Sequence, residues 1–313
     1  MGESDPAGGD ADTSHARGPL RDLIGYRGQP PDPRWPGGAK LAINFVLNVE
    51  EGSEPSVLDG DGYTENRLTD ATMPLDHNRD LAAEGLFEYG SRVGFWRVQR
   101  AFHEHEIPLT IFACAVALER NPPIAEAIID GGHDVCSHGY RWVNHRAMGE
   151  EEEREQIRLA VASFRRTLGH QPPGWYCRYG PSINTRRLLV DHGGFAYDSD
   201  AYNDDLPYWT NVEGSNHLVL PYSLTTNDAK LLTSTGSEWS DFIGDAIDVL
   251  RHEGQERPTM LSIGLHPRIV GQPARFSGLA RLLDRVGDLD DVWLTSRLAI
   301  ADHWATAHPP PLT

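Results

Sequence analysis

Cysteine, basic side chains and long apolar runs are all scarce in this sequence of 313 residues. Its 28 Lys and Arg stand against 46 Asp and Glu, and the net charge of -18 disfavours binding to nucleic-acid phosphates or anionic lipid. The three cysteines, Cys114, Cys136 and Cys177, lie in apolar strand-like runs and form no C-x-x-C pair. This pattern argues against disulfides and structural zinc, and it predicts buried thiols.

The sequence also has no run of the roughly 20 apolar residues that a membrane helix needs. Its first 18 residues lack the basic and apolar regions of a signal peptide. We therefore expect a cytoplasmic protein without a membrane or nucleic-acid partner. Residues 1–25, rich in Gly, Asp, Ser and Pro, are predicted to form a disordered tail, and residues 26–313 to form a single domain.

Apolar β-type runs alternate with amphipathic helical patterns along the rest of the chain. The predicted strands are KLAINFVLNV, PLTIFACAV, HDVCSHG, GWYCRY, FAYDSD, HLVLPYS, TMLSIGLHP and DVWLTS. Helical patterns include RVGFWRVQRAFHEHE, PPIAEAIIDGG, EEEEREQIRLAVASFRRTLG, NTRRLLVDHGG and EWSDFIGDAIDVLRHEG. This α/β alternation predicts a parallel sheet closed or nearly closed into a (β/α) barrel, with a doubly wound open sheet as the alternative.

The chemistry of such barrels lies at the C-terminal ends of the strands, where polar residues end several apolar runs. Glu50 and Glu51 end the first run before Gly52, where both carboxylates can reach one pocket and their repulsion raises the pKa of one of them. A solvated pair of charges in a loop is the alternative. His138 follows the HDVCS run within a glycine-hinged loop, and it is either functional or a hydrogen-bonded core residue.

Three further strand ends carry polar groups. Arg178 precedes Gly180 and Pro181 and can hold a carboxylate or polarise a carbonyl, or it can be a surface cation. His266 ends the TMLSIGL run and is a candidate proton donor. The stretch YDSDAYNDDLPYW is dense in aspartates, some of which turn capping explains.

Taken in order, these motifs resemble the NodB-type polysaccharide deacetylases, carbohydrate esterase family 4, over residues 40–300. That family carries Asp-Asp-Gly, S/N-H-x-x-x-H, R-x-P and L-x-H motifs in this order. The corresponding stretches here are Glu50-Glu51-Gly52, SHGYRW from Ser137, RYGP from Arg178 and Leu265-His266. The resemblance implies a distorted (β/α) barrel of the NodB type and a hydrolase.

The departures from these motifs concern the metal ligands. Zinc in this family needs an Asp and two His, and here Glu51 and His138 stand at two ligand positions while Trp142 stands at the third. An indole offers no lone pair to a metal ion and cannot serve as a ligand, so only Glu51 and His138 would remain as ligands. His133 would face away on its strand, and His145 could substitute only if the loop folds back. We expect no metal cofactor, although zinc stays an alternative.

The same changes, together with NTRRLLV, YDSDAYNDDLPYW and GLHPR, resemble a narrower branch, the metal-independent allantoinases. This resemblance implies hydrolysis of a cyclic amide. The stretch WYCRYGPS is less typical of allantoinases than the other motifs, so the substrate can be allantoin, another hydantoin or a cyclic imide. It also implies a homo-oligomer. A metal-dependent polysaccharide or peptidoglycan N-deacetylase and a degenerate barrel that only binds a small molecule are the alternatives.

On this reading Glu50 activates water, and Glu51 and His138 orient it or share its proton. Arg178 stabilises the oxyanion and His266 protonates the leaving nitrogen. The indole of Trp142 can pack on a flat ring, or it can simply fill the core. The residues that we expect to contact the substrate are Tyr140, Trp142, Tyr179, Asp204, Asp205 and Arg268.

Overall fold

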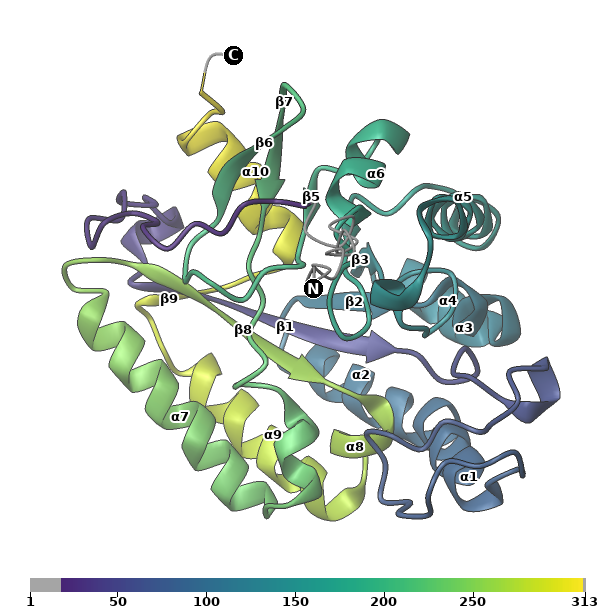
Figure 1. Cartoon of the computed structure of the whole chain (residues 1–313). Coiled ribbons are helices and arrows are strands. Elements are labelled where there is room, and N and C mark those ends of the chain that lie inside the picture. The colour runs from purple at the N-terminus through teal and green to yellow at the C-terminus, as the bar shows by residue number, and fades with distance from the viewer. Residues whose placement is uncertain (1–17, 312–313) are drawn as a thin grey trace, which may run out of the picture.

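The computed structural model describes residues 18–311, and its sheet is a strongly curled half-barrel wrapped by helices (Figure 1). Residues 1–17 of the predicted tail lie outside the described residues, and residues 18–25 are exposed and contain no helix or strand. The strands of the sheet are β1 (Leu41–Val49), β2 (Leu109–Ala113), β3 (Asp134–Ser137), β4 (Gly174–Trp175), β5 (Tyr197–Asp198), β6 (Tyr208–Val212), β7 (Ser215–Val219), β8 (Thr259–Leu265) and β9 (Val292–Leu294).

The strand order is β6-β7-β5-β4-β3-β2-β1-β8, and every pairing is parallel except that between β6 and β7. One edge of β1 pairs with β8, while its other edge pairs with β9 at its start and with β2 at its end. An irregular bridging segment follows β7 and lies along the edge of β8 that does not pair with β1, where Asn227 pairs with Gly264. The distorted, single-domain barrel predicted from the sequence is therefore confirmed.

The helices follow the predicted alternation and cover the outside of the sheet. They are α1 (Leu81–Tyr89), α2 (Phe95–Glu104), α3 (Ala115–Arg120), α4 (Pro122–Asp130), α5 (Glu150–Thr167), α6 (Thr185–His192), α7 (Gly236–Glu253), α8 (Pro267–Val270), α9 (Pro273–Gly287) and α10 (Arg297–Ala307). In Figure 1, α7 and α9 lie beside β8, and α5 lies on the opposite side of the molecule. No helix within residues 18–311 is long and apolar enough to span a bilayer.

Strand β1 contributes side chains to both faces of the sheet, because successive side chains of a strand point to opposite sides. Phe45 and Leu47 belong to the main apolar core under the helices. Asn44 and Asn48 point into the barrel, where their amides donate to the carbonyl oxygens of Leu261 and Leu265. The interior is thus partly polar, and its hydrogen bonds hold β1 beside β8.

Arg297 is another polar residue of the barrel interior, and it is fully buried at the start of α10. Its guanidinium donates to Asn44 Oδ1 at 3.1 Å, to Ser262 Oγ at 2.6 Å and to the Pro221 carbonyl at 3.0 Å. Burial lowers the pKa of Arg297. These contacts tie β1, β8 and the bridging segment together.

Candidate active site

The ends of β1, β3 and β8 bring Glu50, His138 and His266 together, and the structure buries all three side chains. The turn after β1 directs Glu50 inward, because its carbonyl accepts from the Ser53 amide at 2.9 Å and from Ser53 Oγ at 2.6 Å. Gly52 has a φ of 88°, a conformation that favours glycine in this turn. Glu50 and Glu51 therefore enter the same pocket from consecutive positions.

Glu50 is the centre of the cluster. Its Oε1 lies 3.1 Å from His138 Nε2 and 3.7 Å from His266 Nε2, and its Oε2 lies 2.7 Å from Arg268 Nη2. The contact to His138 is a hydrogen bond, whereas 3.7 Å is too long for a hydrogen bond to His266. Two imidazoles and one guanidinium therefore surround a single carboxylate.

Arg268 also contacts Glu51, with Nη1 lying 3.2 Å from Glu51 Oε1. Its guanidinium stacks 4.6 Å from the ring centroid of Phe87 and 5.0 Å from that of Trp142. The Nε atom donates to the carbonyl oxygen of Leu68 at 3.0 Å. One fully buried cation thus bridges the two successive carboxylates and is fixed on several sides.

Burial and charge set different protonation states for these groups. Burial acts to raise the pKa of Glu50, but the charges of Arg268 and His266 and the hydrogen bond from His138 outweigh it and hold that pKa far below its usual value. Burial raises the pKa of Glu51 against the opposing charge of Arg268. The pKa values of the two neighbouring carboxyls are therefore shifted in opposite directions, and Glu50 is the more acidic.

The hydrogen bonds of His138 constrain where its proton lies. Its Nδ1 faces the carbonyl oxygen of Tyr176 at 2.9 Å and must donate to it, since a carbonyl can only accept. The Nε2 atom faces Glu50 Oε1, another acceptor. A second proton must therefore lie between His138 and Glu50, and this pair can shuttle a proton to or from a bound water.

Asp228 is a member of the site that sequence reasoning missed. Its Oδ1 lies 2.6 Å from His266 Nδ1, and its Oδ2 accepts from the His266 amide at 2.7 Å. Burial acts to lower the pKa of His266, but the charges of Asp228 and Glu50 outweigh it and raise that pKa. The carboxylate fixes the ring orientation and leaves Nε2 directed at Glu50.

Arg178, predicted to stabilise an oxyanion, contacts Glu65 and Trp142 and does not contact Glu50. Its guanidinium pairs with the buried carboxylate of Glu65 and donates to the carbonyl oxygen of Trp142 at 2.6 Å. It stacks 3.7 Å from the ring centroid of Trp142 and 4.4 Å from that of Tyr179. Arg268, predicted to contact substrate, is the arginine that reaches Glu50.

The remaining predicted contact residues divide between two places. Trp142 is 1% exposed and lies between Arg178 and Arg268, a placement that favours the core-filling interpretation. Tyr179 is 41% exposed with a φ of 58°, so its ring borders the site from the surface side. Tyr140 is half-buried against the main core.

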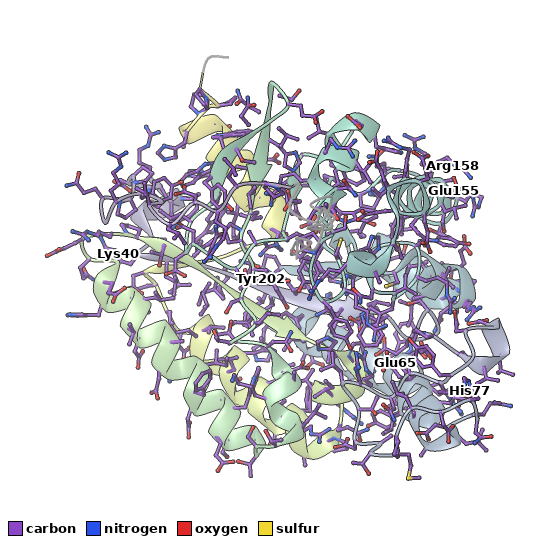
Figure 2. The ribbon with its side chains drawn as sticks, viewed as in Figure 1. Lys40, Glu65, His77, Glu155, Arg158 and Tyr202 are labelled. Carbon is purple, nitrogen blue, oxygen red and sulfur yellow. The ribbon has the colours of Figure 1, made fainter. Side chains whose placement is uncertain are left out.

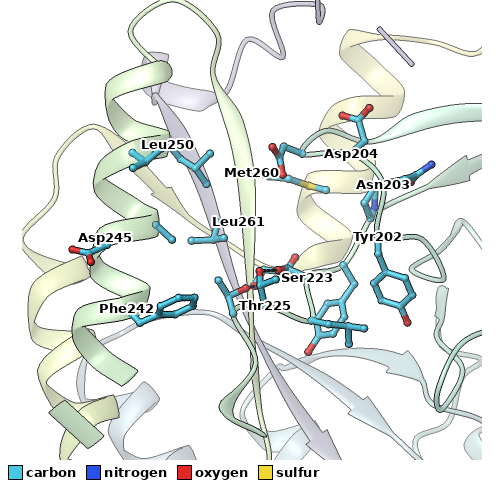
Figure 3. Close-up of a pocket in the computed structure, with 18 residues that line it drawn as sticks. Tyr202, Asn203, Asp204, Ser223, Thr225, Phe242, Asp245, Leu250, Met260 and Leu261 are labelled. Atoms are coloured by element: carbon cyan, nitrogen blue, oxygen red, sulfur yellow. Dashed lines mark hydrogen bonds between the residues drawn. The ribbon is translucent and has the colours of Figure 1, made fainter. Parts of the chain in front are cut away.

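Asp204 and Asp205 line a different feature, a lateral cavity of about 710 Å³ between α7, β8 and the loop after β5 (Figure 3). The Asp205 carbonyl oxygen accepts from the Met260 amide near the start of β8, six residues before His266. Six residues of strand span about 20 Å. The structure does not bring these two aspartates to Glu50.

The segment between β1 and α1 packs over the cluster. In Figure 2, Lys40 lies near the start of β1 and Glu65, which belongs to this segment, lies beyond its other end. Arginines from four other places hold this segment by side-chain contacts. They are Arg120 to Asp59, Arg141 to Asp61, Arg178 to Glu65 and Arg275 to Asp70. These ion pairs fix the segment to the rest of the barrel.

The donors near Glu51 do not fit a zinc ion. Glu51 is directed at Arg268 and His138 at Glu50, while Trp142 offers no lone pair. A metal site needs several His, Cys, Asp or Glu ligand atoms close together. Within residues 18–311, only His145, Glu153 and Cys177 bring three such atoms within 4.8 Å of one another. That group contains neither Glu51 nor His138.

The trio of His145, Glu153 and Cys177 is already engaged in hydrogen bonds. Glu153 Oε1 lies 3.2 Å from His145 Nδ1 and accepts from Thr185 Oγ1 at 2.5 Å, while its Oε2 accepts from the Ser182 hydroxyl. The Cys177 sulfur accepts from an indole N–H at 3.1 Å. These bonds give the trio a structural role that ties α5 to the loop after β4. The loop does not bring His145 to Glu51.

The sequence and the fold are similar to those of known proteins. Residues 84–196 match the polysaccharide deacetylase family model. A protein of Schizosaccharomyces pombe, provisionally named a polysaccharide deacetylase, is 38% identical over 92% of this chain and 98% of its own length. The crystal structure of a probable polysaccharide deacetylase from Pseudomonas aeruginosa PAO1 has a TM-score of 0.89 and 45% identity, covering 93% of this chain and 99% of that one. The crystal structure of Puue allantoinase has a TM-score of 0.89 and 46% identity, covering 93% and 98%.

Proposed function

This chain is a hydrolase of the polysaccharide deacetylase family, and we propose that it opens a cyclic amide, allantoin or a related hydantoin or imide, without a resident metal. The observation that carries this proposal is the position of Arg268. Its guanidinium contacts Glu50 and also Glu51, the residue at which the family resemblance implies a zinc ligand. The similarity to Puue allantoinase supports the cyclic substrate.

In this mechanism Glu50 receives the proton of the attacking water. A carboxylate with a lowered pKa is a weak base by itself, so His138 acts with it through the proton that lies between them. A substrate entering between Glu50 and Arg268 would weaken their contact and raise the pKa of Glu50 toward the range of a better base. Water activation thus depends on a pair of groups.

His266 supplies the proton for the departing ring nitrogen. Its Nδ1 is engaged by Asp228 and its pKa is raised, so the imidazolium persists to higher pH and Nε2 can donate. Its Nε2 lies 3.7 Å from Glu50 Oε1, so the acid and the base face the same point of the site. One side of the amide is therefore attacked while the other is protonated.

Arg268 is the positive charge nearest to these groups and would stabilise the developing oxyanion, in place of Arg178. A well-placed donor typically contributes about 3 kcal/mol to such stabilisation. A site without zinc forgoes a strong Lewis acid and therefore suits a reactive carbonyl. Hydantoin and imide carbonyls meet this requirement, because a second acyl group withdraws electron density from the ring nitrogen.

A metal-dependent N-deacetylase remains the second candidate, since two relatives bear the name of polysaccharide deacetylase. Such an enzyme would use Glu51 and His138 as ligands and release acetate from N-acetylglucosamine oligomers. The two candidates differ in substrate and in metal requirement, so one set of assays separates them.

The test is a panel of substrates supplied to the protein before and after metal removal. Allantoin, hydantoin, succinimide, maleimide and N-acetylglucosamine oligomers would be compared at equal concentration. We predict that one or more of the rings is opened at the same rate in both samples, with no acetate released. Acetate release that requires added zinc would refute the proposal in favour of the deacetylase.

The expected homo-oligomer has a candidate surface near the lateral cavity, and we propose that a second copy covers it. Leu224, Phe242 and Val249 are exposed along the cavity. The aliphatic side chains of Leu23 and Ile24 are exposed on the segment that reaches its rim. Light scattering of a Phe242→Glu variant should give a lower mass than the parent, and an unchanged mass would remove this surface.

A further inference from the structure

A π-helical turn, η4 (Gly90–Gly94), joins α1 to α2 beside the candidate site. Such turns are rare, and they occur frequently at functional sites. The first and last residues of the turn, Gly90 and Gly94, are both buried. Gly90 has a φ of -54° and Gly94 a φ of -62°, which any residue adopts in a helix. Backbone conformation therefore does not explain either glycine.

Space explains Gly90. A Cβ at this position would lie 2.5 Å from Glu51 Oε1, 2.8 Å from its Cγ and 2.9 Å from its Cδ. The three heavy atoms nearest to such a Cβ all belong to Glu51. The carboxylate cannot simply swing away, because Oε1 faces Arg268 Nη1 and Oε2 accepts from the Glu50 amide at 3.1 Å.

Gly94 makes an equally close approach to the segment that carries Arg268. A Cβ at position 94 would lie 2.1 Å from the carbonyl oxygen of Pro267, and one at Gly271 would lie 2.5 Å from Gly94 Cα. The turn thus meets Glu51 at its first residue and the backbone beside Arg268 at its last. One π-helical turn therefore contacts both the Glu51 carboxylate and the backbone segment that carries Arg268.

We infer that this π-helical turn is a positioning element that sets the Glu51 carboxylate against Arg268, and that Gly90 is the residue that admits Glu51. The Glu51 carboxylate can occupy the place beside Arg268 only because position 90 has no side chain to fill that space. Glycine in a helix costs about 1 kcal/mol relative to alanine, so the space it leaves must be useful. The effect on catalysis rests on the proposed function, but the packing claim does not.

Gly90→Ala is the informative variant, and Gly85→Ala is its matched control. Gly85 lies one turn earlier in α1, and a Cβ there would meet nothing within 4 Å. Both substitutions would be made in the parent chain and in a Glu51→Ala chain, and the Tm of each protein measured. We expect Gly90→Ala to lower Tm in the parent, and to lower it by less than half as much once Glu51 is absent.

The Gly85→Ala control should leave Tm unchanged or raise it in both backgrounds. An equal loss of Tm from Gly90→Ala with and without Glu51 would overturn the inference, because the clash would then be with another group. This comparison needs no substrate, so its outcome is independent of the proposed activity.

Kinetics test the positioning role separately. If Gly90 acts through Glu51, Gly90→Ala should lower kcat on the ring that the parent opens by about 10- to 100-fold, with little change in KM, as small displacements of reacting groups do. The Gly85→Ala variant should match the parent. A Gly90→Ala protein with parental kcat would show that the position of Glu51 does not matter for turnover.

Discussion

Replacement of Arg268 by methionine would remove the only cation that contacts both Glu50 and Glu51 among the described residues, while keeping a side chain of similar length. The guanidinium nitrogens lie 2.7 Å from Glu50 Oε2 and 3.2 Å from Glu51 Oε1, and all three side chains are buried. Breaking a buried ion pair by removing one partner typically costs about 3–5 kcal/mol. We predict a loss of this size in the free energy of unfolding near pH 8.

Urea denaturation at several pH values is the appropriate assay. Without the charge of Arg268, the folded-state pKa of Glu50 rises, and that of Glu51, already raised by burial, rises further. The native state then binds more protons than the unfolded state below those raised pKa values, so lowering the pH through them relieves the unpaired charge. The deficit of Arg268→Met should therefore shrink as the pH falls toward 5.

Two controls make the measurement specific. Arg275→Met removes an ion pair with the half-exposed Asp70 and should cost about 0–1 kcal/mol. Adding Glu50→Gln and Glu51→Gln to Arg268→Met removes the unpaired charges and should restore at least half of the lost stability. A single variant as stable as Arg275→Met, or a triple variant no better than the single one, would refute the role of Arg268 as their counter-ion.

Further predictions concern the acid and the base. Glu50→Gln and His266→Ala should each lower turnover by about 100- to 10,000-fold in protein that circular dichroism shows to be folded; a near-parental rate in either variant would remove that residue from the mechanism. Because His266 must be protonated and its pKa is raised, kcat should fall as the pH rises through that pKa. Asp228→Asn lowers the pKa of His266 and should move this decline to lower pH; an unmoved profile would exclude His266 as the titrating acid.

The barrel and the ends of its strands could be predicted from sequence because both depend on local patterns. Apolar runs predicted eight of the strands, and three of these runs, which form β1, β3 and β8, end where Glu50, His138 and His266 enter the site. Strand β6, YWTNV, was not predicted, and its first two residues fall in the aspartate-rich stretch YDSDAYNDDLPYW. The signal was present: Glu213 and Gly214, both with positive φ, form a two-residue turn between YWTNV and SNHLV.

The partners of the site residues could not be predicted, because they come from distant positions. Asp228 lies 38 residues before His266, at the start of a short 3-10 helix, and no sequence pattern marks it as a hydrogen-bond partner of that ring. Glu65 engages Arg178 across 113 residues and so withdraws it from the predicted role. Arg268 was recognised only as a contact residue, since its bridge to two carboxylates depends on how β8 lies beside β1.

Asp204 and Asp205 show the opposite error. Their position after a predicted strand suggested a place in the pocket, but the chain after β5 turns back along the barrel gap to the start of β8. Sequence spacing gives the order of strand ends and does not give the course of the loops that follow them.

Turnover of allantoin by exhaustively chelated protein, with metal content measured on the same sample, tests metal-free ring opening most directly. We predict an unchanged kcat at a metal content far below one ion per chain. Loss of activity on chelation, with recovery on addition of one equivalent of zinc, would contradict a site in which Arg268 serves as the cation.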